Sequence, residues 1–427
     1  MIEFVPPQPL INPFITPPPP DPGPLEGLRQ AMLGPVGVLA FVPLAPLTRW
    51  LARRDKRAAL LVLPIVWWLA TVGPTLAGLM LWGGVALAAA WIGMLSALRR
   101  RNRLSQRGMV TLVWVGLHAL VLPLWWFPHP FWFPGMLAPL HALGIAYFLL
   151  RLVDWGVSVA RDPAQPSRPL DTLLWLLYPP CARLGPVMTR EEFLIEFDDW
   201  NPATPTPWRA MLKRFGYLVV GCVAIGVCVH NFPKPKPDGV NFFDTPEHYT
   251  TDQLTSVLLL VPMLAYLALW IYNELAAFVA LWVGLPVRNN FNWLPTSCDI
   301  RDFWRRWHVT VGDWMDKHIF KPLGGHRRRT PLNYAIVFGY SALWHGASLS
   351  FLLWGFSQTV AINIQRRWDL WRKRTGRRNW PNNPVWTATA WLITMSIAAT
   401  TMVVFADFQH CGGRYFPELF RRLISGT

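Results

Sequence analysis

The chain has 427 residues, of which 52% are apolar and only 15% charged, against roughly 25% charged residues in soluble domains. It holds 26 tryptophans, a residue that favours the membrane–water interface. The formal net charge is +16, and the basic residues occur in short blocks between apolar runs, as the positive-inside rule predicts for cytoplasmic loops. These features exclude a soluble enzyme and a nucleic-acid-binding protein. They predict an all-α polytopic membrane protein whose cytosolic face attracts anionic lipids or an anionic donor molecule.

The N-terminal segment differs in composition from the rest of the chain. Its first 25 residues include ten prolines, among them the run Pro17–Pro20, which no helix accommodates. We therefore predict a flexible Pro-rich arm over residues 1–28 and one polytopic membrane domain over 29–427. No cleavable signal peptide is visible, and the five cysteines form no zinc-binding spacing, so no metal site is expected.

Apolar runs of about 20 residues predict the membrane-spanning helices. The first is Leu33–Leu47, and Ala58–Leu98 is long enough for two spans joined at Gly73-Pro74 or Gly83-Gly84. Counting shorter, re-entrant pieces, the pattern predicts a bundle of about 9–12 transmembrane or re-entrant helices around a central tunnel. The later candidates are Met109–Phe127, Gly135–Leu150, Leu212–Val229, Leu254–Trp270 and Val385–Phe405, with Leu173–Leu177 and Leu275–Pro286 too short to span.

The segment Leu332–Ile362 is almost uncharged and conflicts with a single crossing. About 30 helical residues measure roughly 45 Å, which is long for one span and short for two. A single crossing would place the basic cluster Arg366–Arg378 opposite the basic segment Asp299–Arg329, against the charge rule. We therefore expect the chain to bend near His345-Gly346.

His345 is an ionisable residue within this apolar segment. An imidazole at bilayer depth is expensive, so we expect it to face a cavity or a partner rather than lipid. Glycine, alanine and serine residues surround it and allow neighbouring helices to approach closely. Two interpretations remain open from the local sequence: a general base that removes a hydroxyl proton, and a packing histidine bound to a backbone carbonyl.

A second histidine, His308, lies in a basic, Trp-rich segment. Helical periodicity places Trp304, Trp307, His308, Val311 and Met315 on one face of a predicted amphipathic helix at the membrane surface. An interfacial anchor whose histidine only donates or accepts a hydrogen bond explains this pattern as well as a functional site does.

Five segments between residues 148 and 360 form an ordered series of motifs. Each is short and weak alone, whereas their shared order and spacing are specific. The third contains His308 and the fifth contains His345. The segments are Phe148-Leu-Leu-Arg-Leu-Val-Asp-Trp155, Tyr178–Phe193 with its Gly185-Pro186 turn, Phe303–Trp314, Pro322-Leu-Gly-Gly325 and Leu343–Gly355.

This series resembles the membrane-bound O-acyltransferase superfamily, and most closely its bacterial branch of alginate O-acetyltransferases and teichoic acid D-alanyltransferases. The resemblance implies that His345 is the catalytic histidine and that His308 is the second signature residue, lining a tunnel. We assign substrate binding to four neighbouring residues. They are Trp344, Trp307, Arg305 and Trp304.

The resemblance further implies a reaction, in which an acyl group, acetyl or another short chain, passes from a thioester donor to a hydroxyl of an envelope polysaccharide. The expected donor is acyl-CoA or an acyl-phosphopantetheine carrier protein, with no bound cofactor. Expected partners are the bilayer of the inner membrane and an acceptor polymer, reached directly or through a partner transferase.

Two alternative functions stay open. The first is a transporter or flippase that uses His345 in a proton relay, and the second is a membrane subunit without chemistry of its own. The chain departs from the family at Asp316-Lys317-His318 and at Phe405-Ala-Asp407.

Overall fold

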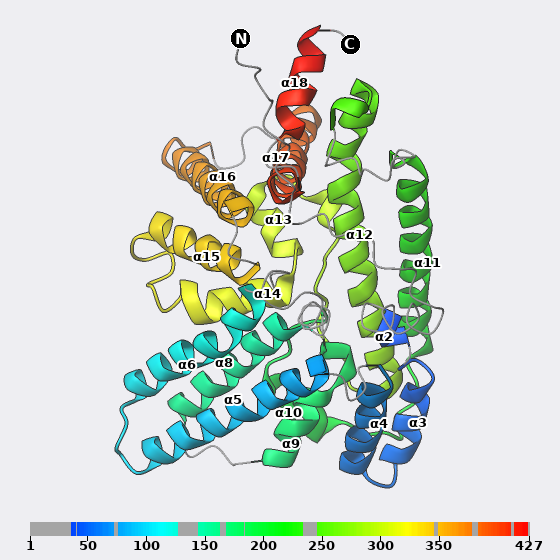
Figure 1. The fold of residues 1–427 in the computed structure, drawn as a ribbon, viewed down its shortest axis with the longest axis vertical. Helices are drawn as coiled ribbons and strands as arrows, with labels where there is room; N and C mark the ends of the chain where they lie inside the picture. Colours follow the sequence, from blue (N-terminus) through cyan, green and yellow to red (C-terminus); the bar gives the residue numbers. More distant parts are fainter. Residues whose placement is uncertain are drawn as a thin grey trace, which may run out of the picture.

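The computed structural model is built of helices packed side by side (Figure 1). No strand occurs in the residues that it describes, which confirms the predicted all-α fold. The Pro-rich arm predicted over residues 1–28 lies outside these residues. The described residues are 36–39, 41–71, 76–126, 144–162, 168–182, 184–233, 246–345, 349–377, 383–410 and 414–425.

The first predicted span, Leu33–Leu47, is wrong as a single helix. The chain instead forms a short helix α2 (Val36–Leu39), a turn, and α3 (Leu44–Ala52). Pro43 stands at the N-terminal end of α3, where a proline is tolerated because that amide has no helical partner. Two helices, α4 (Lys56–Thr71) and α5 (Leu76–Arg100), lie where the pair of spans was expected, and Gly83-Gly84 lies within α5 rather than at the turn. Of the two, only α5 contains a segment long and apolar enough to cross a membrane.

Three long helices then cross the lower part of the view in Figure 1 and lie side by side: α5, α6 (Gln106–Trp126) and α8 (Ile145–Arg161). The predicted span Gly135–Leu150 is only partly described, since α8 begins at Ile145. Two short helices follow, α9 and α10, and α10 begins with a capping box between Thr189 and Glu192. Their bounds are α9 (Pro169–Leu177), the 3-10 turn Pro179–Cys181, and α10 (Arg190–Asp199).

Helices α11 (Trp208–Asn231) and α12 (Thr251–Val283) form a long antiparallel pair. The sequence predicted two separate pieces within α12, and this was wrong. The helix continues through Pro262 and ends at Gly284, whose left-handed φ of 96° is typical of a glycine C-cap. The short 3-10 turn Pro246–His248 precedes α12.

The single amphipathic helix predicted around His308 is also wrong. Two seven-residue helices, α13 (Ile300–Arg306) and α14 (Val309–Met315), flank a break at Trp307 and His308. The break arises because His308 adopts a left-handed conformation, with φ of 45°. A 3-10 turn, Leu294–Thr296, precedes α13, and a π-helical turn, Asp316–Phe320, follows α14.

The bend predicted near His345 is confirmed, because α15 (Thr330–His345) ends at this residue and α16 (Leu349–Arg374) returns along it. Gly355 allows the close approach of the two helices. A Cβ atom there would lie 2.7 Å from the Phe338 carbonyl oxygen and 3.0 Å from the Ala342 side chain. Helix α17 (Pro384–His410) packs against α16, and α18 (Tyr415–Ser425) packs against α12 and α17.

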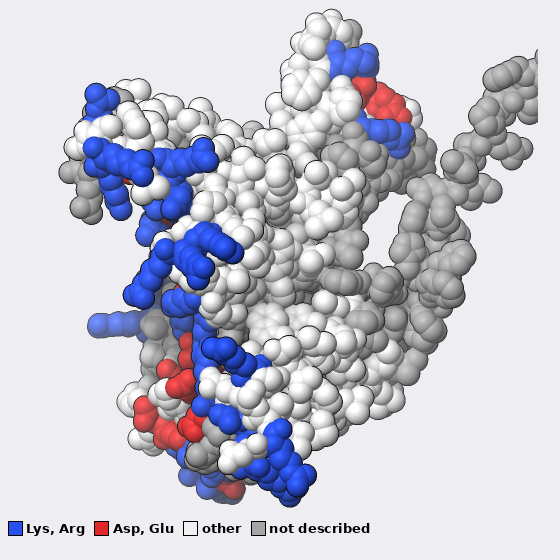
Figure 2. All heavy atoms as spheres, turned by 90° about the vertical axis from the view of Figure 1, so that its left-hand side faces the viewer, with Lys and Arg blue, Asp and Glu red and all other residues white. Residues whose placement is uncertain are grey.

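Four of the described helices are long and apolar enough to cross a membrane: segments of α5, α11, α12 and α17. The predicted total of 9–12 also counts shorter and re-entrant helices, and stays a prediction. Figure 2 shows Lys and Arg gathered mainly along one edge of the molecule, while most of the remaining surface in that view carries no charge. This separation fits a multi-pass membrane protein with one basic face.

Candidate active site

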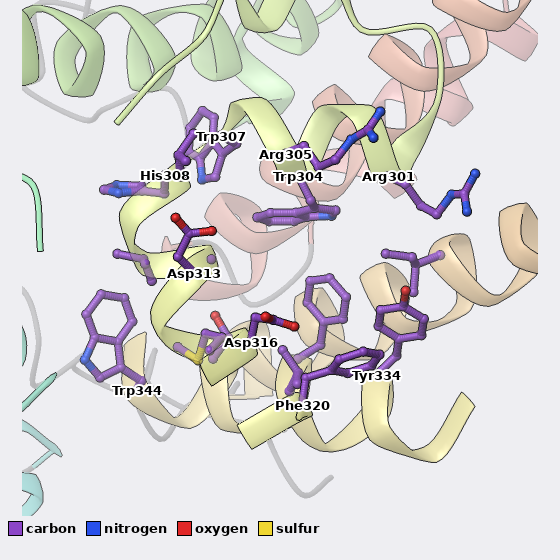
Figure 3. Close-up of a pocket in the computed structure, with 18 of the residues that line it drawn as sticks. Arg301, Trp304, Arg305, Trp307, His308, Asp313, Asp316, Phe320, Tyr334 and Trp344 are labelled. Carbon is purple, nitrogen blue, oxygen red and sulfur yellow. The ribbon is translucent and has the colours of Figure 1, made fainter. Parts of the chain in front are cut away.

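A cavity of about 690 Å³ lies between α13, α14, the π-helical turn and the α15–α16 pair. All six residues selected from the sequence line it, although they come from two helices, α13 and α15, and from the break between α13 and α14. Figure 3 shows His308 and Trp344 at one end and Arg301 and Tyr334 at the other. The six are His345, His308, Trp344, Trp307, Arg305 and Trp304.

A network of buried amides holds the ring of His308. The Asn290 side-chain nitrogen lies 3.0 Å from His308 Nδ1, and its second hydrogen is donated to the Asn273 side-chain oxygen, also at 3.0 Å. Asn290 also accepts, through its backbone oxygen, a hydrogen bond from the amide of Val309 at 2.9 Å. These bonds stabilise the ring of His308 and the backbone that follows it, which favours the left-handed conformation at the break.

The orientation of the Asn290 amide determines which nitrogen of His308 carries the proton. The backbone N–H of Thr310 can only donate, and it lies 3.0 Å from Asn290 Oδ1, which identifies this atom as the oxygen. The NH₂ group therefore faces His308 Nδ1 and donates to it. It follows that neutral His308 carries its hydrogen on Nε2 and can donate it.

Tyr147 is a site residue that the sequence analysis missed. Its hydroxyl lies 3.5 Å from His308 Nε2, and its ring packs against Trp344 with centroids 5.5 Å apart. It is buried at the start of α8, next to the first matched motif. Asn290 was missed as well, because one asparagine in a polar loop gives no pattern. Tyr147 lies one residue before Phe148, so extending that motif would have included it.

His345 is positioned by aromatic contacts. Its ring stacks on Phe351 at a centroid distance of 5.4 Å and meets the edge of Trp354 at 5.5 Å. Both aromatic residues belong to α16, so the α15–α16 pair fixes the imidazole at the last residue of α15. His345 is exposed and lines the cavity.

Two of the three tryptophans of the site donate a hydrogen bond through the indole N–H, and the third is held by stacking. Trp304 Nε1 donates to Gln358 at 3.3 Å, and Gln358 donates to Thr401 of α17 at 2.8 Å. Trp344 Nε1 donates to the carbonyl oxygen of Ala146 at 3.2 Å and is therefore not free to bind substrate. The Trp307 ring stacks on Phe303 with centroids 5.9 Å apart. These indoles form rigid apolar walls.

Charged residues line the other end of the cavity. Arg305 is exposed, pairs with Asp302 at 3.0 Å, and turns away from His308 (Figure 3). Arg301 pairs with Asp369 of α16. Asp316 accepts a hydrogen bond from Lys321 at 2.6 Å, which raises the pKa of that ammonium group. Among the described residues, no group of three His, Cys, Asp or Glu side chains is arranged to hold a metal ion.

The second matched motif, Tyr178–Phe193, is linked to His308 by a chain of hydrogen bonds. The Val187 amide donates to the Thr310 hydroxyl at 2.9 Å, which in turn donates to Asn290 at 2.8 Å. Gly185 permits the sharp turn that makes this possible, since a Cβ there would lie 2.1 Å from a backbone oxygen of Pro180. The motif thus reaches His308 through three hydrogen bonds.

Two of the three residues at which the chain departs from the family motif, Asp316-Lys317-His318, contact helix α8. His318 and Lys317 each lie 2.8 Å from Asp154, a buried residue of α8 in the first matched motif. Trp314 of the preceding helix donates to the Leu150 carbonyl oxygen at 2.8 Å. These contacts fasten the π-helical turn, and with it the wall of the cavity, to α8.

The fold and the cavity define the class: a multi-pass helical membrane protein with two histidines in one cavity. The chain belongs to the MBOAT, membrane-bound O-acyltransferase family, whose model matches residues 106–406. This confirms the resemblance found from the motifs.

The sequence identity to individual relatives is low. The chain is 25% identical over 214 residues to a peptidoglycan O-acetyltransferase of Helicobacter pylori, covering 47% of this chain and 38% of that protein. It is 24% identical over 369 residues to a "Probable alginate O-acetylase AlgI" of Pseudomonas putida, covering 80% and 70%. A Pseudomonas aeruginosa protein of the same name is 33% identical over 98 residues, 22% of this chain and 19% of that protein. The chain spans about half the length of several of the curated relatives it matches.

Proposed function

We propose that this protein transfers a short acyl group from a thioester donor to a hydroxyl group of a cell-surface polysaccharide. One observation carries the proposal: His308, at the break between α13 and α14, and His345, at the end of α15, line the same 690 Å³ cavity. Family membership supports acyl transfer, and the names of the relatives, which act on alginate and peptidoglycan, support a polysaccharide acceptor.

His345 is the general base of the proposed reaction. It takes the proton of the acceptor hydroxyl while the oxygen attacks the thioester carbonyl carbon. The C–O bond forms, the carbonyl oxygen gains negative charge, and the C–S bond then breaks. The thiolate leaves with the proton that His345 removed, so His345 returns to its neutral form. The aromatic contacts that fix its ring favour this role, because a base must hold its reactive nitrogen within hydrogen-bond reach of the hydroxyl.

His308 is the proposed hydrogen-bond donor to the negatively charged carbonyl oxygen. Asn290 donates to Nδ1, so Nε2 carries the hydrogen, and the carbonyl oxygen would replace the long 3.5 Å contact of Nε2 with the Tyr147 hydroxyl. A donor that is already oriented stabilises the transition state without reorganisation. Arg305 fits this role poorly, since it is exposed, paired with Asp302 and turned away from His308.

The charged end of the cavity is the proposed entry for the donor. Acyl-CoA and the phosphopantetheine arm of an acyl carrier both contain phosphate groups, which arginine binds well. Arg301 and Arg305 line this end, and the exposed run Arg327–Arg329 follows the π-helical turn. With the basic face in the cytosol, the donor enters from the inside of the inner membrane and the acceptor from the opposite side. Trp304, Trp307 and Trp344 would form the apolar walls around the acyl group and its thioester.

The experiment is an analysis of surface polymers in cells that lack the gene. Mass spectrometry of polysaccharide from the deletion strain should show the loss of ester-linked acyl groups. The wild-type gene should restore them, whereas a gene encoding His345→Ala, produced at equal level in the membrane, should not. Unchanged acylation in the deletion strain, or full restoration by His345→Ala, contradicts the proposal.

A further inference from the structure

A buried amide, that of Gln358, lies on the face of α16 that turns to the histidine cavity. Trp354 and Ile362 line the cavity from this face, and Gln358 lies between them, about one helical turn from each. Gln358 is only 2% exposed. The opposite face carries exposed apolar side chains, as a lipid-facing surface does: Leu352, Phe356, Val360 and Ile364. A buried amide in such a helix is costly unless its donor and its acceptor are both bound.

Both halves of the Gln358 amide are bound. Its oxygen accepts a hydrogen bond from Trp304 Nε1 of α13 at 3.3 Å, and its nitrogen donates to the Thr401 hydroxyl oxygen of α17 at 2.8 Å. An indole N–H can only donate, so the amide oxygen is the atom that faces Trp304. Thr401 donates its own hydrogen to the Ile397 carbonyl oxygen at 2.8 Å, and its oxygen therefore accepts from Gln358. The bonds run in one direction, from α13 through α16 to the backbone of α17.

The indole at the start of this chain of hydrogen bonds lies in the cavity wall. Its ring meets the edge of Phe338 at a centroid distance of 5.2 Å and that of Trp354 at 5.9 Å. Trp354 in turn contacts His345. Figure 3 shows Trp304 between the end of the cavity that holds His308 and the end that holds Arg301. Ring contacts tolerate several orientations of an indole, whereas a hydrogen bond at Nε1 selects one.

We propose that Gln358 is a positioning residue for donor binding, and that Thr401 orients its amide. Together they hold the Trp304 indole as a fixed wall between the two ends of the cavity, so the thioester arm of the donor binds to a preformed surface. Loss of this support weakens binding in the ground state and in the transition state alike, which raises KM and leaves kcat unchanged. The role of Gln358 rests on the proposed function, because that function assigns the donor to this cavity.

The test measures acyl transfer by the purified full-length protein in detergent as the donor concentration is varied. The donor is acetyl-phosphopantetheine, the part that both expected donors share, and the acceptor is polysaccharide from the deletion strain. Gln358→Met removes both hydrogen bonds and keeps an unbranched side chain. It should raise KM for the donor by about 2- to 12-fold at unchanged kcat, as the loss of one neutral hydrogen bond implies. A variant that only folds less well would instead lower the apparent kcat at unchanged KM.

Substitutions in α17 provide the rescue and the matched control. Thr401→Val removes the hydroxyl and should raise KM in the same way, whereas Thr401→Ser retains it and should keep the wild-type KM. Thr394 is also buried, and its hydroxyl donates to the Ala390 carbonyl oxygen of the same helix at 2.8 Å. Thr394→Val should therefore leave both KM and kcat unchanged.

A double variant shows whether Gln358 acts through Trp304. Phenylalanine has no N–H, so Gln358 has nothing to hold in Trp304→Phe, and adding Gln358→Met should raise KM no further. A wild-type KM in Gln358→Met, or rises in KM that add in the double variant, would overturn the role of Gln358. Should Gln358→Met fail to fold, the comparison of Thr401→Val with Thr401→Ser decides, and equal KM values contradict the role.

The same assay separates the two proposals. If the wild type forms no acyl ester from the thioester, the proposed function fails. If the wild type transfers the acyl group and KM is the same in Gln358→Met and Thr401→Val, only the role of Gln358 fails.

Discussion

The two histidines of the cavity are held in different ways. His308 stands at a helix break, where Asn290 donates a hydrogen bond to its ring and accepts one from the backbone amide of the next residue, Val309. His345 stands at a helix end, where Phe351 and Trp354 fix its ring by stacking and edge contact. A hydrogen-bond network determines the position of the proton as well as that of the ring, whereas aromatic contacts determine the position of the ring alone.

This difference suits different chemical tasks. A residue that donates one hydrogen bond throughout the reaction benefits from a fixed proton, and His308 has one. A base must change its protonation state during each turnover, and an imidazole between aromatic rings is free to do so. The following predictions test this contrast.

The largest effect is expected for His345→Ala. Removal of a general base lowers kcat by about 10²- to 10⁴-fold. The rate of acyl transfer by the purified variant, at saturating donor, measures the loss. His230→Ala, a change at an exposed histidine of α11, is the matched control and should keep the wild-type rate.

A smaller loss is expected for His308→Asn. Asparagine tolerates the left-handed backbone that this position requires, and the change removes the Nε2–H donor. Loss of one oxyanion donor lowers kcat by about 10²- to 10³-fold with little change in KM. A rise in KM at unchanged kcat would show that His308 binds substrate instead.

Asn290→Ala tests the network itself. The change leaves His308 in place but frees its Nδ1, so the proton is no longer confined to Nε2. We expect a loss of about 5- to 160-fold in kcat, as a buried polar partner worth about 1–3 kcal/mol implies. A wild-type rate in this variant would remove the argument for a fixed tautomer.

On the side of His345, Gly355→Ala should destabilise the α15–α16 pair. The new Cβ would lie 2.7 Å from a backbone oxygen, and overpacking of this kind costs about 1–3 kcal/mol. Gly339→Ala is the matched control, because nothing lies within 4 Å of a Cβ at that position. Thermal unfolding in detergent should show a lower midpoint for Gly355→Ala alone.

The smallest effect is expected away from both histidines, in α18. Hydrogen bonds from Arg421 and Arg422 lower the pKa of Glu418 to about 2. Because the folded pKa lies below the unfolded value, this contribution is present above about pH 4.5 and is lost as the pH falls towards 2. Glu418→Gln should therefore lower the free energy of local opening of α18 at pH 7 by about 0.2–1 kcal/mol, and should leave it unchanged near pH 2. Hydrogen exchange of the α18 amides measures this free energy.

The sequence predicted the site better than the fold around it. The six residues selected from the third and fifth motifs all line one cavity, and these two motifs stand out because each holds a histidine, His308 or His345, which is rare in apolar segments. The charge rule predicted the bend at His345, since a single crossing would have placed basic residues on both faces. Their chemical roles stay predictions until the variants above are measured.

Backbone geometry was harder to predict. Periodicity favoured one helix around His308, and only the contacts of Asn290, a residue distant in the sequence pattern, explain the break. The interrupted hydropathy of α12 suggested two pieces, since polar residues such as Asn273 and Glu274 face protein rather than lipid there. Hydropathy averaged over a stretch of sequence carries no information on contacts with residues elsewhere in the fold, so it predicts neither feature.

The most direct test of the central claim is a mass balance with the purified wild-type protein in detergent, where no transmembrane gradient exists. An isotope-labelled acyl thioester is supplied together with an acceptor polysaccharide. The account predicts one labelled ester on the polysaccharide for each thioester consumed above the hydrolysis background, with both quantities dependent on His345 and His308. Gradient-dependent flux in vesicles without thioester consumption would contradict it, and would identify the two-histidine cavity as part of a transport path.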